Sequence, residues 1–125
     1  MEIVTPTPIN PEEVYGQIKK KTAGSVIFHF AVVREMTEGK TTTSIEFHRN
    51  GDIEEELREI SKKISERWKV EDVYIIRRLG ILEVGDIISL VAVSSPHRDD
   101  AFDACRYGVE RLKKMKTIKK SEYFK

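Results

Sequence analysis

A stripe of apolar side chains at helical spacing, within residues 52–68, is the feature that most constrains this fold. Its members are separated by four, three, four and four residues, so they lie along one side of an α-helix. A helix with one apolar side must bury that side against another layer of the domain. The stripe consists of Ile53, Leu57, Ile60, Ile64 and Trp68.

Strand-like segments before and after this helix supply the expected partner layer. Residues 25–33 (SVIFHFAVV) are β-branched and aromatic, and residues 41–48, 70–77 and 86–94 are also predicted strands. A short edge strand is expected at residues 3–5. The segment 80–85 is expected to connect the strands 70–77 and 86–94.

Two further helices complete the predicted order of elements. Asn10 and Pro11, followed by two glutamates, are typical of a helix start, and this helix is expected to end near Lys21. Residues 98–115 form the other helix. The pattern predicts an α+β fold, with a mixed β-sheet and flanking helices, in a single domain spanning residues 1–125 with a basic C-terminal tail from about residue 113.

Length and charge argue against several classes of protein. The chain has 125 residues, 39% of them apolar, and a formal net charge of +1, which is typical of one ordinary globular domain. This near balance makes nucleic-acid binding over the whole surface a poor hypothesis. The charge is uneven, however, because residues 111–125 carry seven basic side chains and one acidic side chain.

Cysteine and histidine usage argues against a metal site. Cys105 is the only cysteine, which excludes an intrachain disulfide and a multi-thiolate site. The three histidines lack metal-ligand spacing, and we expect no cofactor. No apolar run approaches the roughly 20 residues that span a bilayer, and residues 1–13 lack signal-peptide features. We therefore expect a cytoplasmic protein that does not bind a membrane.

The most informative polar stretch is SSPHR at residues 94–98, where a predicted buried strand leads into a helix. The first turn of a helix presents unpaired N–H groups and a positive dipole end, and His97 and Arg98 add donors there. This end is therefore a candidate site for a phosphate or carboxylate. The alternative is that both side chains only pair with Asp99, Asp100 or other acids.

Other candidates are weaker when taken one at a time. Arg34, at the tip of strand 25–33, is a possible second anion ligand or simply a solvated strand end. Lys113 and Lys120 lie in the basic segment, where lysines commonly meet the negative end of a helix dipole. His29 is interpreted as a core or interface residue. Cys105, on the apolar side of the last helix, is interpreted as core packing.

Three blocks of sequence resemble successive signature blocks of one known family, in the same order and at the same spacing. They are GSVIFHFAVVRE at 24–35, RRLGILEVGD at 77–86 and SLVAVSSPHRDDAFDACRYGVERLK at 89–113. In these blocks the chain resembles the large, catalytic subunit of molybdopterin synthase, and the resemblance extends from about residue 3 to residue 124.

The resemblance implies an α/β hammerhead arrangement and a defined set of partners. The family's large subunit is a homodimer that binds one ubiquitin-like small subunit at each end, giving a heterotetramer. The C-terminal Gly-Gly of the small subunit carries a thiocarboxylate, which delivers sulfur to cyclic pyranopterin monophosphate. Two sulfurs yield molybdopterin. The chain is accordingly expected to be a sulfurtransferase of molybdenum cofactor biosynthesis that binds no nucleic acid.

The resemblance also assigns roles to particular positions. Arg34, His97 and Arg98 match residues that hold the anionic end of the substrate. Lys113 matches the main catalytic lysine, and Lys120 matches a second catalytic lysine; both also belong to the substrate-binding set. Ser121 and Glu122 complete that set beside Lys120.

Several positions depart from the family pattern, and they leave other functions open. Arg77 stands where the family has histidine, Ala31 where it has glycine, and Thr117 and Lys119 where it has proline and tryptophan. One alternative is a non-catalytic scaffold that binds the same partner. Another is a small RNA- or nucleotide-binding module that uses the basic tail.

A homodimer is also indicated by the residues themselves. Strand 25–33 carries more apolar side chains, on both of its faces, than a small domain is expected to bury. The side chains in question include Val26, Phe28, Phe30 and Val32.

Overall fold

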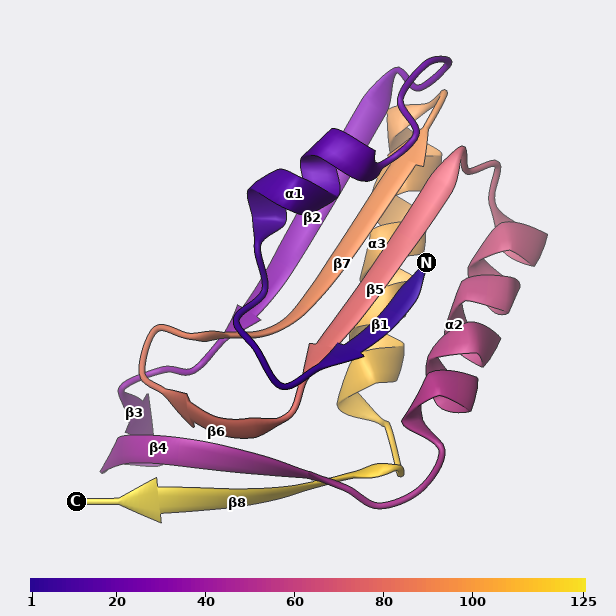
Figure 1. The fold of residues 1–125 in the computed structure, drawn as a ribbon. Coiled ribbons are helices and arrows are strands. Elements are labelled where there is room, and N and C mark those ends of the chain that lie inside the picture. The colour runs from indigo at the N-terminus through magenta and orange to yellow at the C-terminus, as the bar shows by residue number, and fades with distance from the viewer.

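The computed structural model describes residues 1–125 and contains two β-sheets and three helices (Figure 1). The larger sheet has four strands in the order β1-β5-β7-β2. β1 runs parallel to β5, whereas β5 and β2 both run antiparallel to β7. These strands are β1 (Glu2–Thr5), β2 (Ser25–Val32), β5 (Asp72–Arg78) and β7 (Ile87–Ser95).

Helices cover both faces of this sheet. α2 (Ile53–Arg67) and α3 (Arg98–Lys113) pack side by side on one face, and α1 (Pro11–Gln17) lies on the other (Figure 1). The predicted α+β class, with a mixed sheet and flanking helices, is therefore confirmed. None of the helices is long and apolar enough to cross a membrane.

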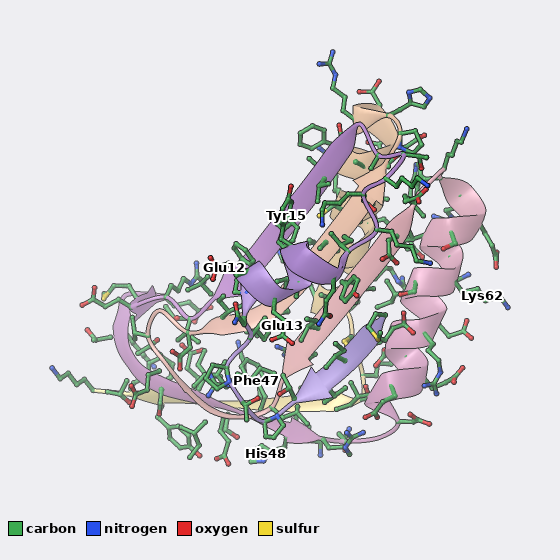
Figure 2. All side chains as sticks on the ribbon, turned by 45° about the horizontal axis from the view of Figure 1, so that its top comes forward. Glu12, Glu13, Tyr15, Phe47, His48 and Lys62 are labelled. Atoms are coloured by element: carbon green, nitrogen blue, oxygen red, sulfur yellow. The ribbon has the colours of Figure 1, made fainter.

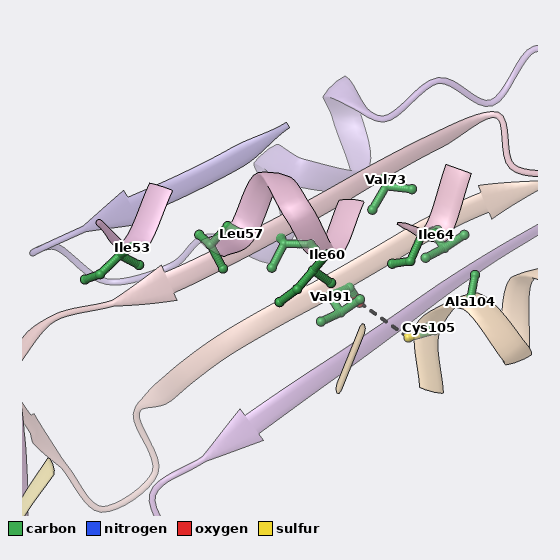
Figure 3. Close-up of a cluster of buried hydrophobic side chains, with 10 residues drawn as sticks. Ile53, Leu57, Ile60, Ile64, Val73, Val91, Ala104 and Cys105 are labelled. Carbon is green, nitrogen blue, oxygen red and sulfur yellow. Dashed lines mark hydrogen bonds between the residues drawn. The ribbon is translucent and has the colours of Figure 1, made fainter. Parts of the chain in front are cut away.

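The apolar stripe of residues 52–68 forms the centre of the main core. Ile53, Leu57 and Ile64 are fully buried and pack with side chains of β5, β7 and α3 (Figure 3). Asp52 caps the helix, since its Oδ1 accepts a hydrogen bond from the Glu55 N–H at 3.0 Å. On α3, a Cβ added at Gly108 would lie 3.1 Å from a methyl group of Val91, so glycine permits close packing of α3 on β7.

α1 begins as predicted but ends before the expected boundary near Lys21. Asn10 Oδ1 accepts hydrogen bonds from the N–H groups of Glu12 and Glu13, and Pro11 is the first helical residue. Ile18 leaves the helical conformation and is buried in the core under α1. The next N–H, of Lys19, donates to Asp72 Oδ2 at 3.1 Å. Tertiary contacts thus stop the helix one residue after Gln17.

β2 carries apolar side chains on both of its faces, as expected, although three of the residues named for this surplus, Val26, Phe28 and Phe30, share one face. Val26 and Phe28 pack with the core under α1, whereas Ile27 packs with the core under α2 and α3. Because side chains alternate along a strand, Phe30 shares the face of Phe28, and their ring centroids are 6.2 Å apart. The register shifts between Ala31 and Val32 at a β-bulge.

A second, antiparallel sheet crosses one end of the larger one (Figure 1). Its central strand, β4, pairs with β6 on one side, with β8 on the other and with the short β3. The strands are β3 (Met36–Thr37), β4 (Lys40–Arg49), β6 (Gly80–Glu83) and β8 (Ile118–Phe124).

Two predictions fail in this second sheet. Residues 80–85 do not form a mere connection, because 80–83 are strand β6, with Leu82 buried beside Ile45 and Phe47. The expected basic tail is strand β8, whose backbone pairs with β4 over most of its length. Its lysine-rich composition does not favour a strand, and the hydrogen bonds from β4 override that composition.

The core role of the α2 stripe gives a direct test of stability. Ile64→Ala leaves a cavity in a fully buried site and is expected to lower the free energy of unfolding by about 2–5 kcal/mol in a urea titration. Lys62→Ala, on the outer side of the same helix (Figure 2), should change it by less than about 0.5 kcal/mol. Equal effects of the two substitutions would contradict this packing.

Candidate active site

A pocket of about 650 Å³ lies where the two sheets meet the C-terminal end of α3. The last residues of β2, the middle of β4, the end of β5 and the start of β7 form part of its wall. The end of α3, the turn after it and β8 form the rest. Most of its lining is hydrophobic, and no Asp or Glu lines it. Its charged lining residues are all basic: Arg34, Arg77, Lys113 and Lys120.

Three residues singled out from the sequence therefore meet in this pocket. Arg34 follows the end of β2, Lys113 is the last residue of α3, and Lys120 lies on β8. All three side chains are exposed, so their charges are accessible to a ligand in the pocket. Cations grouped in a cleft raise the local concentration of anions.

The pairing register decides which lysine of β8 faces the pocket. Lys120 is opposite Phe47 in the β4–β8 ladder, and Lys119 is opposite His48. Phe47 is buried and lines the pocket, whereas His48 is exposed on the other side of β4 (Figure 2). Because successive side chains alternate between the faces of a sheet, Lys120 points into the pocket and Lys119 points away from it.

Ser121 and Glu122 do not line the pocket, but Glu122 contacts a residue that does. Its Oε1 lies 3.7 Å from Lys120 Nζ, and its Oε2 accepts a hydrogen bond from Thr42 Oγ1 at 2.6 Å. The bonds from Thr42 and then Thr37 hold the pKa of the Glu122 carboxyl below its ordinary value, with a smaller effect from the Lys120 ammonium. Ser121 follows Lys120 on the opposite face of the strand.

Another carboxylate, on α2, fixes the turn between Lys113 and Lys120. Glu56 Oε1 accepts hydrogen bonds from Thr117 Oγ1 at 2.6 Å and from the Thr117 N–H at 3.2 Å. Its Oε2 accepts from the Lys116 N–H at 3.1 Å. Thr117, one of the departures from the family pattern, thus has a structural role in placing β8.

His97 and Arg98 lie at the opposite end of α3 from this pocket. The helix runs from Arg98 to Lys113, so its two ends are roughly 24 Å apart at 1.5 Å per residue. Both side chains are exposed, and neither forms the ion pair with Asp99 or Asp100 that was the alternative interpretation. Within one chain, the expected convergence of Arg34 with His97 and Arg98 does not occur.

The two serines before His97 are structural. Ser94 Oγ donates to the Lys19 carbonyl at 2.5 Å, and Ser95 Oγ donates to the Lys69 carbonyl at 2.6 Å. Both serines are fully buried, so their hydroxyl groups hold the loops before β2 and β5 against the end of β7. The SSPHR motif therefore combines a buried, structural half with an exposed, basic half.

The sequence-based interpretation holds for Cys105 but only in part for His29. His29 was interpreted as a core or interface residue; it is exposed and lines the pocket, so the core interpretation is wrong, and a place at an interface stays a prediction. Cys105 is buried, its Sγ donates to the Val91 carbonyl at 3.7 Å, and burial raises the pKa of its thiol to about 11 (Figure 3). The prediction that Cys105 serves core packing is confirmed.

No group of His, Cys, Asp and Glu side chains is arranged to hold a metal ion.

Arg77 is the pocket residue that sequence analysis missed. The sequence marks it only as a departure from the family pattern, yet it is buried on β5 and lines the pocket. Burial lowers the pKa of its guanidinium to about 10, which leaves it charged at neutral pH. The sequence feature that indicates this is the pair Arg77-Arg78 at the end of an apolar strand. Successive side chains of a strand point to opposite faces of the sheet, so one of two adjacent arginines must point inward.

Comparison with known proteins identifies the family. Residues 4–115 match the family described as MoaE protein. The molybdopterin synthase catalytic subunit of Bacillus subtilis (strain 168) is 36% identical over 120 residues, which cover 95% of this chain and 76% of that protein. The crystal structure of molybdopterin synthase from Staphylococcus aureus superposes with a TM-score of 0.90 at 34% identity, covering 98% of this chain and 90% of that one.

A more distant structure shares the fold. It is the protein–protein complex of subunits 1 and 2 of molybdopterin-converting factor from Helicobacter pylori 26695, with a TM-score of 0.75, 15% identity and coverage of 98% of this chain and 84% of that one. The family match spans most of the chain, and the Bacillus relative agrees with it over nearly the whole length. This chain belongs to the MoaE family, the catalytic subunits of molybdopterin synthase, which act in molybdenum cofactor biosynthesis.

Proposed function

We propose that this chain catalyses the sulfur transfer of molybdopterin synthase. A ubiquitin-like small subunit supplies sulfur as the thiocarboxylate of its C-terminal Gly-Gly, and cyclic pyranopterin monophosphate receives it. Two transfers yield molybdopterin. The observation that carries the proposal is the pocket shared by Arg34, Lys113 and Lys120, because its charged lining is entirely basic.

A basic pocket suits this reaction because both reactants are anions. A thiocarboxylate and a cyclic phosphate repel each other, and fixed cations around them offset that repulsion. Lys113 and Lys120 present ammonium groups from two different elements, a helix end and a strand. In this proposal the thiocarboxylate sulfur forms a bond to a carbon of the pterin, and water then displaces it from the terminal carbonyl, which leaves the tail as a carboxylate. Lys113 donates a hydrogen bond to that carbonyl and so assists the breaking of its C–S bond. Lys120 stabilises charge that develops nearby.

The small-subunit partner is supported by the fold and by the shape of the site. The Helicobacter protein that shares this fold is a complex of two subunits. A pocket of about 650 Å³ is within the usual range for a bound small molecule, and its apolar lining suits a flat pterin ring. The chain end of a partner can reach it because the lysines at its rim are exposed.

A homodimer explains how His97 and Arg98 contribute to substrate binding. They lie roughly 24 Å from Lys113 in the same chain, so we propose that a second chain brings its own pair to this pocket. β2 is an edge strand of the larger sheet, and Phe30 and Val32 on it are 39% and 47% exposed. Exposed apolar side chains on an edge strand favour association with another chain.

The role of Lys113 can be tested by comparing it with its neighbour. In an assay of the chain with thiocarboxylated small subunit and pterin precursor, Lys113→Ala should lower molybdopterin formation by a factor of about 10² to 10⁴. Lys114→Ala should matter far less, because Lys114 does not line the pocket. Both lysines are exposed, so folding and small-subunit binding should persist. Full activity of Lys113→Ala would refute the assignment, and equal losses would show that only bulk positive charge matters.

The two lysines of β8 offer a second matched pair. Lys120→Ala removes a charge from the pocket and should lower turnover by about 10² in the same assay. Lys119→Ala, which removes the same charge from the other face of the strand, should leave turnover near that of the unmodified chain. A larger loss from Lys119→Ala would contradict the register of β8.

The homodimer is tested by sedimentation of the chain alone. At micromolar concentration the sedimentation coefficient should correspond to two chains, because a single 14.4 kDa chain leaves apolar residues of β2 exposed. A monomer under these conditions would count against the shared site.

A further inference from the structure

Arg77 is an unusual residue to find in the interior of a small domain. It is 9% exposed, whereas arginine is almost never fully buried unless it is paired. Its neighbour Arg78 follows the usual rule, since Arg78 Nη1 lies 3.4 Å from Asp86 Oδ2. No acidic oxygen lies within ion-pair distance of Arg77. A buried charge without a counter-ion lowers the stability of the free protein.

The contacts of Arg77 hold its side chain in place but leave most of its donors free. Nη1 donates to the Ile88 carbonyl at 3.2 Å, and the guanidinium lies 4.3 Å from the ring centroid of Phe47. Of the five N–H groups of an arginine, this accounts for one. A stacked guanidinium with unused donors is already oriented for a planar or tetrahedral anion.

The side chain is also directed at the ligand site. Arg77 lines the basic pocket together with Arg34, Lys113 and Lys120. Phe47 connects Arg77 to one of the lysines. The Arg77 guanidinium lies over the Phe47 ring, and Phe47 is the partner of Lys120 in the β4–β8 ladder. Arg77 thus lies on the inner wall of the pocket, whereas the two lysines are exposed at its rim.

We propose that Arg77 is a further substrate-binding residue, whose free N–H groups hold an anionic oxygen group of the ligand at the inner wall of the pocket. The identity of that ligand rests on the proposed function: the group is either the phosphate of the pterin or the terminal carboxylate of the small subunit. Bound there, the anion supplies the missing counter-ion. The guanidinium in turn fixes the depth at which the anion sits.

The test uses Arg77→Met, which keeps much of the side-chain volume and removes the charge. Arg111→Met is the matched control, because Arg111 is exposed on the last turns of α3 and does not line the pocket. Binding is measured calorimetrically at constant ionic strength with two probes, inorganic phosphate and a synthetic peptide ending in Gly-Gly with a free carboxylate. Thermal unfolding without either probe is recorded for each variant.

We expect Arg77→Met to be at least as stable as the unmodified chain in the absence of probe, because it removes an unpaired buried charge. Its affinity for one or both probes should fall about tenfold or more, as expected for a lost hydrogen bond to a charged group. If only the affinity for phosphate falls, Arg77 binds the phosphate of the pterin substrate. If only the affinity for the peptide falls, Arg77 binds the C-terminal tail of the small subunit. Arg111→Met should retain both affinities.

Two results would overturn the inference. One is unchanged affinity of Arg77→Met for both probes, and the other is a loss no larger than that of Arg111→Met. Should Arg77→Met fail to fold, Arg77→Lys is measured instead. It keeps the charge but loses the planar fork, and unchanged affinity in that variant would equally refute the proposal.

These binding measurements need no sulfur transfer, so they separate the inference from the proposed function. A chain that binds phosphate through Arg77 but makes no molybdopterin would refute the function and leave the anion site intact. A chain that makes molybdopterin at the same rate with Arg77→Met would refute the inference alone.

Discussion

The reversal of the chain after α3 is the constraint on which the pocket depends. Glu56 holds that turn by accepting hydrogen bonds from Lys116 and Thr117. Glu56 belongs to α2, whose apolar stripe is anchored in the main core. The position of β8, and with it the position of Lys120 relative to Lys113, therefore follows from the packing of α2. Sites supported by rigid elements hold their geometry better than sites on free loops.

The basic side chains of the pocket repel one another, and neighbouring groups partly offset that electrostatic repulsion. Lys113 ends α3, where the partial negative charge of the helix terminus favours an ammonium group. Lys120 lies 3.7 Å from Glu122, which is itself held by Thr42. Arg77 has only a carbonyl and an aromatic ring. The uncompensated part of this charge makes the pocket suited to an anionic ligand, because a bound anion would offset the repulsion that lowers the stability of the free protein.

The sequence predicts those elements that are specified by residues close together in the chain. The stripe of α2 and the cap at Asn10 are visible because helical periodicity and capping involve residues a few positions apart. β8 could not be predicted in this way, since a lysine-rich strand exists only because β4, far earlier in the chain, provides its hydrogen bonds. The same holds for the site: Lys113 and Lys120 were identified by resemblance, but their convergence with Arg77 required the register of two sheets.

α3 is a rigid spacer between two groups of basic side chains, one at each end of the helix. At its start, His97 and Arg98 extend from a helix N-terminus that is held in place by the buried hydroxyl groups of Ser94 and Ser95. At its end, Lys113 faces the pocket. A helix of this length does not bend enough to bring its ends together. Any small ligand that contacts both groups must therefore receive one of them from a second chain.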